Sequence, residues 1–227
     1  MIVVYFILAL AIGYFLGAIP FGKIYVKYFT GKNLEEIGSG RSGGTNSMRA
    51  GGWRVGVMTG FTDVLKGLGA LLLTRWIMTQ WGVSAELLPW IEVTTGMASV
   101  FGHNWSIFYS FRGGAGTGPN IGWAAAVWPP IFPVGVVVMV SMIFVVGWAS
   151  VGSLAMAIVI PIGFAWLYFS GSTAVADTPA YLVGGQLTFG FDRYSLRANI
   201  ARLLRGEERV VGLRAHWLKQ QANGTQD

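Results

Sequence analysis

Long apolar segments alternate with short polar connections along most of the chain. Apolar residues dominate seven segments, and proline, glycine or charged residues bound each of them: 2–22, 55–78, 88–108, 119–129, 131–147, 153–169 and 180–192. A transmembrane helix needs ~20 mainly apolar residues, and several of these segments approach that length. The pattern predicts an all-α, polytopic integral membrane protein of about seven transmembrane helices with short polar loops. The last segment is the weakest of the seven.

The composition agrees with a membrane protein and narrows the choice of partners. Of the 227 residues, 53% are hydrophobic and 11% are charged, whereas soluble domains carry about 25% charged residues. The net charge of +6 would suit nucleic acid, but basic loops facing anionic lipid explain it better in so apolar a chain. We therefore expect membrane lipids and no nucleic acid as partners. Because the chain has no cysteine, disulfides and cysteine-based metal sites are excluded.

The distribution of lysine and arginine predicts the orientation. Residues 1–22 carry no basic segment ahead of their apolar run, which favours a retained first span with its N-terminus outside. The connections 23–54, 109–118 and 148–152 and the C-terminal segment then face the cytoplasm, and they hold 14 of the 16 basic residues. We expect a multi-pass plasma-membrane protein with a membrane-embedded domain over 1–208 and a basic cytoplasmic tail over 209–227.

The first cytoplasmic connection contains the most polar and glycine-rich stretch of the chain, residues 38–49. Glycine lets the backbone adopt positive φ values and approach a ligand, and successive N–H groups in such a turn can bind an anion. Arginine adds a planar fork that fits phosphate. The candidate anion-binding residues are Gly38, Ser39, Gly40, Arg41, Gly43, Thr45, Asn46 and Arg49. The alternative is a flexible surface loop.

A second cytoplasmic connection has the same character. Arg112 precedes four glycines within six positions, and Pro119 follows at a favoured first helical position. The N–H groups at a helix N-terminus attract anions, so Arg112, Gly113, Gly114 and Gly116 are candidates for a second phosphate site. A tight turn between two spans is the alternative.

The third polar segment, residues 196–208, follows the last apolar one. Its apolar residues recur at helical spacing, and Asn199 and Arg202 are three residues apart, so both can face one ligand. A basic amphipathic helix that lies on anionic lipid would produce the same pattern.

Three ionisable residues stand inside or beside the apolar segments. Asp63 and Lys66 are three residues apart on one helix face, and charges at that depth need a partner, so we expect an ion pair near the cytoplasmic end. Its role is structural, or alternatively to line the site. His103 ends the third apolar segment beside the second glycine loop. It is a candidate site residue, and its alternative role is to anchor the helix end.

The sequence does not predict covalent or metal-assisted catalysis. It has no paired carboxylates placed for acid–base catalysis near the cytoplasmic face, and no histidine and acidic residues spaced for a metal. Residues 40–44 match Gly-x-Ser-x-Gly, but a nucleophile elbow needs a strand before this motif, and the pattern here predicts only helices and loops. We expect no cofactor and no metal. An enzyme with these residues would act on an already activated substrate, by positioning it and supplying fixed positive charge.

Taken together, the three polar segments resemble the motifs of the bacterial acyl-phosphate:glycerol-3-phosphate acyltransferases. Gly-Ser-Gly at 38–40, the residues up to 49 and Asp-Val-Leu-Lys-Gly at 63–67 are similar to the first motif. Gly-His at 102–103 with Phe-Arg-Gly-Gly-Ala-Gly at 111–116 resembles the second, and residues 197–208 resemble the third. The motifs follow one another in the family's order, and the resemblance extends from residue 17 to about residue 208.

This resemblance implies a seven-span enzyme of the inner membrane with all three motifs at the cytoplasmic face. It implies transfer of a fatty acyl group from acyl phosphate to the 1-hydroxyl of glycerol 3-phosphate, which gives lysophosphatidic acid and phosphate. Ser39, Arg49 and Asn199 would then be catalytic-site residues. The glycines of the second loop would help hold glycerol 3-phosphate, and Glu208 would be structural.

The chain departs from the family pattern at several positions, which leaves alternatives open. Ala115 and Leu196 stand where the family has lysine and histidine, Arg112 stands for a lysine, and Arg41 for an asparagine. Arginine keeps the charge of lysine but not its geometry, and Arg41 is a candidate replacement for the lost cation. One alternative is a homologue without turnover that binds or transports lipid or phosphate. Another is a transferase for a different phosphorylated acceptor.

Overall fold

The computed structural model describes residues 1–171 and 178–211, and over these ranges the chain is almost entirely helical. One helix corresponds to each predicted apolar segment: α1 (Ile2–Ala18), α3 (Gly44–Gln80), α4 (Leu88–Asn104), α5 (Thr117–Val127), α6 (Ile131–Val146), α7 (Ala149–Ser170) and α8 (Ala180–Ser195). The connections contain α2 (Phe21–Thr30), α9 (Arg197–Leu204) and the short 3-10 helices η1 (Leu34–Glu36) and η2 (Ile107–Tyr109). The all-α prediction is confirmed. Most of the expected tail, residues 212–227, lies outside the described residues.

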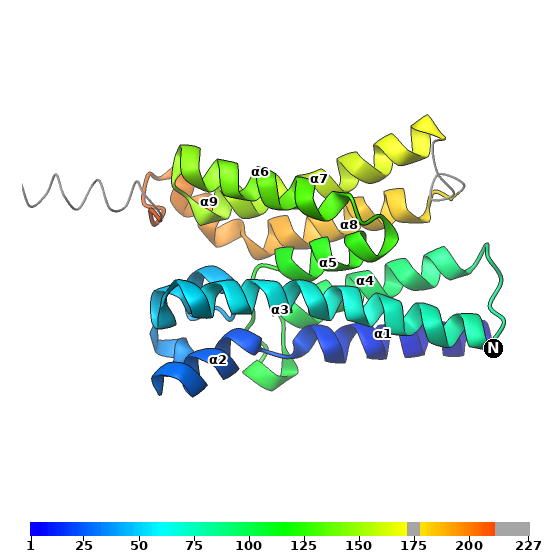
Figure 1. The fold of residues 1–227 in the computed structure, drawn as a ribbon, viewed down its shortest axis with the longest axis horizontal. Helices are drawn as coiled ribbons and strands as arrows, with labels where there is room; N and C mark the ends of the chain where they lie inside the picture. Colours follow the sequence, from blue (N-terminus) through cyan, green and yellow to red (C-terminus); the bar gives the residue numbers. More distant parts are fainter. Residues whose placement is uncertain (172–177, 212–227) are drawn as a thin grey trace, which may run out of the picture.

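Three described stretches are long and apolar enough to cross a membrane: Ile2–Thr30, Gly44–Gln80 and Ala149–Ser170. Helices α5 and α6 are shorter, and Figure 1 shows the turn between them stopping short of the right-hand ends of α1, α3, α7 and α8. These two helices therefore form a hairpin that does not extend as far as its neighbours. The count of seven crossings stays a prediction.

Two helix boundaries differ from the predicted ones. Helix α1 ends at Ala18, earlier than predicted, because Ile19 precedes Pro20 and adopts an extended conformation. Helix α3 begins at Gly44, and a break at Gly52, with a φ of 85°, separates its polar first part from the apolar remainder. The polar connection predicted over residues 23–54 therefore ends in a short helix, which belongs to the candidate site.

The helices form two groups that are joined through α5 and by the packing of α4 against α8 (Figure 1). In one group α1 packs against α4 and α2 against α3, and in the other α7 packs against α6 and α8. Helix α5 contacts α3, α4, α6 and α7. Glycine permits the closest approach, since a β-carbon on Gly67 would overlap the Pro119 carbonyl oxygen, and one on Gly122 would overlap that of Val64. Small residues at the contact are typical of helices that associate within a membrane.

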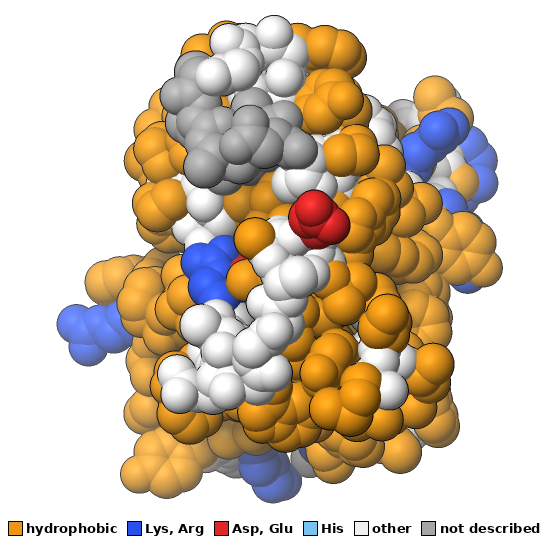
Figure 2. Space-filling model, turned by 90° about the vertical axis from the view of Figure 1, so that its right-hand side faces the viewer, with side chains coloured by type: hydrophobic (Ala, Val, Ile, Leu, Met, Phe, Trp, Pro, Cys, Tyr) orange, Lys and Arg blue, Asp and Glu red, His pale blue; other side chains and the backbone are white. Residues whose placement is uncertain are grey.

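The two ends of the molecule differ in charge. Figure 2 looks at the end where α1 begins, and it shows mainly hydrophobic side chains with few charged ones. The basic residues of the first connection and of α9 lie toward the opposite end (Figure 1). This asymmetry suits a protein whose basic end faces anionic lipid.

A buried carboxylate joins four helices near the less charged end. Arg75 of α3 donates hydrogen bonds to both oxygens of Glu92 on α4, at 2.5 and 3.0 Å, and another to the Ala126 carbonyl oxygen of α5 at 3.0 Å. The Tyr181 hydroxyl of α8 also donates to Glu92, at 2.7 Å. Glu92 is 1% exposed. An ionised group so buried is stable only with such partners, so this contact fixes how α8 meets the other group.

Replacing Glu92 by alanine should destabilise the fold by about 2 to 4 kcal/mol, because Arg75 and Tyr181 would lose their partner inside the bundle. The exposed pair between Arg205 and Glu207 provides the control, since both of its side chains are 59% exposed. Glu207→Ala should change stability by less than ~1 kcal/mol. Thermal unfolding of the detergent-solubilised variants measures both, and equal effects would contradict the assigned role of Glu92.

Replacing Gly67 by alanine should separate α3 from α5 and lower stability by about 1 to 3 kcal/mol, because a backbone carbonyl cannot move aside as a side chain can. Gly69→Ala on the same helix is the matched control, since nothing lies within 4 Å of its added β-carbon. The same unfolding assay should show Gly69→Ala as neutral or slightly stabilising. A neutral Gly67→Ala variant would show that the close contact is dispensable.

Candidate functional site

The first glycine loop is held together by the side chain of Asn46. Its amide accepts a hydrogen bond from the Ser39 N–H at 3.0 Å and donates to the carbonyl oxygens of Ile37 and Arg41, at 2.9 and 3.1 Å. Gly38, with a φ of 59°, lies so close to Asn46 that a β-carbon there would overlap the amide oxygen. Asn46, predicted to bind substrate, thus shapes the loop that presents Ser39.

A buried tyrosine also holds the first glycine loop in place. The Tyr109 hydroxyl donates to the Gly40 carbonyl oxygen at 2.9 Å. Burial, with a smaller effect of Glu35, raises the pKa of Tyr109 to about 12. The hydroxyl therefore keeps its proton, and its role as a donor, at physiological pH.

The second glycine loop packs directly against the first. The Ser42 N–H donates to the Gly113 carbonyl oxygen at 3.3 Å, and the Gly114 N–H donates to the His103 carbonyl oxygen at 3.0 Å. A β-carbon on Gly114 would overlap the His103 ring. This crowding explains Gly114, because a larger residue there would not fit against the His103 ring at the end of α4.

A buried column of three ionisable residues lies under this junction. Lys66 lies 2.9 Å from Asp63, so the predicted ion pair is present. The same ammonium group donates to the Ile19 carbonyl oxygen at 3.1 Å and lies 2.7 Å from Nδ1 of His103. All three side chains are at most 6% exposed. The column therefore ties the ends of α1 and α4 to α3 and supports the His103 ring against the second loop.

In the third polar segment, Glu208 orients the two residues predicted to face a ligand. Its carboxylate accepts hydrogen bonds from Asn199 at 2.9 Å, Arg202 at 3.0 Å and Ser150 of α7 at 3.1 Å. The Val211 N–H donates to the Gly147 carbonyl oxygen at 2.8 Å. Glu208 thus attaches the C-terminal segment to the start of α7 and sets the positions of Asn199 and Arg202.

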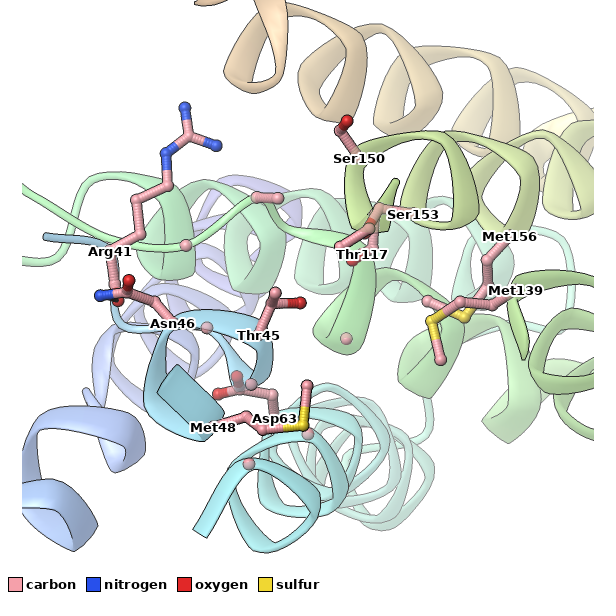
Figure 3. Close-up of a pocket in the computed structure, with 18 of the residues that line it drawn as sticks. Arg41, Thr45, Asn46, Met48, Asp63, Thr117, Met139, Ser150, Ser153 and Met156 are labelled. Atoms are coloured by element: carbon pink, nitrogen blue, oxygen red, sulfur yellow. Dashed lines mark hydrogen bonds between the residues drawn. The ribbon is translucent and has the colours of Figure 1, made fainter. Parts of the chain in front are cut away.

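A cavity of about 500 Å³ lies where the three segments meet. Its polar part is lined by Ser39, Arg41, Gly43, Thr45, Asn46, Arg49, Asp63, His103, Asn199, Arg202, Glu208 and Arg209. Its apolar part runs between helices and is lined by Val57, Phe61, Val64, Ile121, Phe132, Val136, Met139, Ile143 and Met156. Figure 3 shows the two parts, with Arg41, Asn46 and Thr45 on one side and Met139 and Met156 on the other. The cavity is thus amphipathic.

A second, mainly polar cavity of about 460 Å³ adjoins the first. Its lining includes Gly38, Ser39, Gly40, Arg41, Arg112, Gly113, Gly114, Ser195 and Arg197. Ser39, Arg41 and Gly114 line both cavities. Each of the three polar segments contributes one arginine to the second cavity: Arg41, Arg112 and Arg197. Their guanidinium groups can bind an anion there.

Arg41 lies at the boundary between the two cavities. Its guanidinium group donates to the Ser195 carbonyl oxygen at 2.6 Å, which uses one of its five N–H donors. Burial, and then the neighbouring charges of Arg202 and Arg197, lower the pKa of Arg41. Burial and Arg209 likewise lower the pKa of Arg49. Because arginine stays protonated even so, and because the lining arginines outnumber the lining glutamates Glu35, Glu36 and Glu208, the two cavities carry a net positive charge that an anion would stabilise.

Most of the predicted site residues line one of these cavities, but two do not. Lys66 lies behind Asp63 and His103. Gly116, predicted to bind substrate, instead precedes α5 with a φ of 89°, where a β-carbon would overlap Asp192. Its glycine character is explained by this turn and not by a ligand.

The sequence analysis missed two arginines and the whole apolar part of the cavity. Arg197 and Arg209 lie in the basic C-terminal stretch, and charge alone did not distinguish residues facing a cavity from residues facing lipid. Their positions in the sequence were the available indication, because Arg197 is two residues from Asn199 and Arg209 directly follows Glu208. The apolar lining residues look like any lipid-facing or core residue of a span, so no pattern separated them.

Comparisons with known proteins agree with this geometry. The family model described as glycerol-3-phosphate acyltransferase matches residues 7–206. A glycerol-3-phosphate acyltransferase of Clostridioides difficile (strain 630) is 33% identical over 207 residues, which is 91% of this chain and 96% of that protein. One of Lawsonia intracellularis is 32% identical over 199 residues, which is 87% of this chain and 91% of that protein.

Two solved structures of a glycerol 3-phosphate acyltransferase have a similar fold. The crystal structure of PlsY (YgiH), an integral membrane glycerol 3-phosphate acyltransferase, in its glycerol 3-phosphate form has a TM-score of 0.76 at 29% identity, and the match covers 93% of this chain and 98% of that one. The lysophosphatidic acid form gives a TM-score of 0.73 and covers 91% and 95%. With the family model matching nearly the whole chain, these findings confirm an integral membrane protein. The chain belongs to the glycerol-3-phosphate acyltransferase family.

Proposed function

We propose that this chain transfers a fatty acyl group from acyl phosphate to the 1-hydroxyl of glycerol 3-phosphate, with lysophosphatidic acid and phosphate as products. The observation that supports this best is the pair of adjoining cavities, which share Ser39, Arg41 and Gly114. One cavity combines cations with an apolar extension, and the other is mainly polar. A lipid donor and a small polar acceptor would need this combination.

The amphipathic cavity suits the acyl donor. Arg49, Asn199 and Arg202 lie at its polar part, where the phosphate of acyl phosphate would bind. The apolar part offers aliphatic and methionine side chains to the acyl chain, whose burial is favourable by about 25 cal/mol per Å². The carbonyl carbon of the donor would then lie near Ser39 and Arg41.

The polar cavity suits glycerol 3-phosphate. This acceptor carries a phosphate and two hydroxyls, and the cavity offers the guanidinium groups of Arg41, Arg112 and Arg197 together with the Ser195 hydroxyl. Because the cavities meet at Ser39 and Arg41, an acceptor bound here would have its free end directed at the donor. Holding two reactants in contact lowers the barrier without covalent catalysis.

The chemistry requires no nucleophile from the protein. Acyl phosphate is a mixed anhydride with a good leaving group, so the acceptor hydroxyl can attack the carbonyl carbon while the bond to the phosphate oxygen breaks. The hydroxyl proton would pass to the departing phosphate. Arg41 and Arg49 would stabilise the negative charge that develops on the carbonyl and phosphate oxygens. Ser39 would donate a hydrogen bond to one of these oxygens.

The proposed location follows from the same arrangement. The cations of both cavities belong to the connections that the sequence pattern assigns to the cytoplasm. We therefore place the protein in the plasma membrane with its N-terminus outside and both substrates' phosphates at the cytoplasmic face.

Purified protein supplied with palmitoyl phosphate and glycerol 3-phosphate should release inorganic phosphate and form lysophosphatidic acid in equal amounts. Ser39→Ala and Arg49→Ala should each lower kcat/KM by ~10²-fold or more, because each removes a donor directed at developing charge. Arg54→Ala is the matched control, since this exposed arginine of α3 does not line either cavity. Its kcat/KM should stay within about twofold of the unchanged protein.

Other outcomes of this assay would contradict the proposal in different ways. Phosphate binding without any product would support a binding or transport protein that has lost turnover. Turnover with another phosphorylated acceptor, and none with glycerol 3-phosphate, would support a transferase of different specificity.

Arg41→Ala should raise the KM for glycerol 3-phosphate and lower kcat/KM by about 10- to 100-fold, because a charged hydrogen bond to phosphate contributes about 1.5 to 3 kcal/mol. Arg41→Lys should recover only part of this loss, since lysine keeps the charge but not the planar fork. Steady-state kinetics with each substrate varied in turn measures both effects. Unchanged KM and kcat in Arg41→Ala would remove Arg41 from the site.

A further inference from the structure

The apolar part of the first cavity has a definite deep end. Helices α3, α5 and α7 all run away from the polar part, and the last lining residue on each is Val64, Ile121 and Met156. Helix α6 runs the opposite way, so its deepest lining residue is the first one, Phe132. These four side chains therefore form one layer at the far end of the cavity.

Packed residues close the cavity beyond this layer. Phe132 packs against the main hydrophobic core, and Ile131 beside it is 0% exposed. A β-carbon on Gly163 of α7 would lie 3.0 Å from Ile131 and 3.5 Å from Trp128. Gly135 is as closely confined, with Ile121 and Met156 against it. The protein is densely packed here, so a chain that reaches Phe132 cannot extend further along α6.

The length of the cavity corresponds to one membrane leaflet. Phe132 and Ile143 both line it, and at the ordinary helical rise they are ~16 Å apart along α6. Half of the hydrocarbon core of a bilayer is about 15 Å. Phe132 is the second residue of α6 and packs against the main core, and the α5–α6 turn just before it stops short of the neighbouring helix ends (Figure 1).

We infer that Phe132 limits the length of the acyl chain that this enzyme transfers. The inference rests on the proposed function, because it assigns the apolar part of the cavity to the acyl group of the donor. With the phosphate held by the arginines, the terminal methyl of a chain about one leaflet long reaches the Phe132 ring. A longer chain has to displace this ring or bend toward lipid between α3 and α6.

The route toward lipid is the competing possibility. Val57 and Phe61 line the cavity on α3 and are also 60% and 58% exposed, so the cavity wall on that side borders the lipid. A chain that left the cavity there would not touch Phe132. The two paths make opposite predictions for variants on α6.

Phe132→Ala should extend the range of donors to longer chains. With lauroyl, myristoyl, palmitoyl, stearoyl and arachidoyl phosphate, the unchanged enzyme should lose kcat/KM beyond the leaflet-length donors. The variant should raise the ratio of arachidoyl to myristoyl kcat/KM by ~10-fold, the discrimination that a few methylene contacts provide. Phe144→Ala is the matched control, because this phenylalanine of α6 is 63% exposed and does not line the cavity. Its ratio should not change.

Val136→Phe tests the opposite direction. Val136 lines the cavity one turn above Phe132, so a larger ring there should shift the preference toward lauroyl phosphate by a similar factor. Val137→Phe is its control, since Val137 is 63% exposed on the lipid side. Turnover in all four variants with unshifted chain-length profiles would overturn the inference and leave the proposed function standing. Absence of turnover with every donor in the unchanged protein would instead refute the proposed function.

Discussion

The charge of Lys66 has to be neutralised inside the bundle, and the architecture of the polar half follows from how this is done. Lys66 reaches Asp63 on its own helix, the carbonyl oxygen of Ile19 where α1 ends, and the His103 ring at the end of α4. A lysine at that depth is tolerated only with such partners. The His103 ring supports the second glycine loop, which in turn contacts the first. One buried cation thus fixes the relative positions of both loops.

The site itself has the opposite electrostatic character. Its arginines, which include Arg41, Arg49 and Arg202, have Glu208 as the main acidic neighbour, and burial together with neighbouring arginines lowers the pKa of Arg41 and of Arg49. Charge that is left unbalanced in a protein costs stability and is retained at sites that bind a counter-charge. The substrates of the proposed reaction carry two phosphates, which would neutralise this excess of positive charge. Elsewhere in the bundle no substrate binds, so the buried charges are paired within the protein.

How far the sequence predicts this structure depends on whether a residue type is unusual in its segment. Glycine, serine and arginine are unusual next to an apolar span. Their presence allowed both glycine loops and the segment with Asn199 to be predicted as parts of the site, and these residues line the cavities. The helix from Gly44 was missed because its glycines and polar residues suit a loop equally well. Phe132 and Met139 were missed because an apolar side chain has the same pattern whether it faces lipid, the core or a cavity. Their roles depend on tertiary contacts, which periodicity does not encode.

The position of Glu208 has a consequence for the biogenesis of the protein. This residue lines the cavity, orients Asn199 and Arg202, and stands near the C-terminal end of the described chain. Chains are made from the N-terminus, and their parts fold as they emerge. The spans and both glycine loops therefore exist in the membrane before the last wall of the site has been synthesised. A ribosome-bound intermediate that ends before Glu208 would have the apolar cavity without the oriented amide and guanidinium, so the site is complete only once the chain has been made as far as this residue.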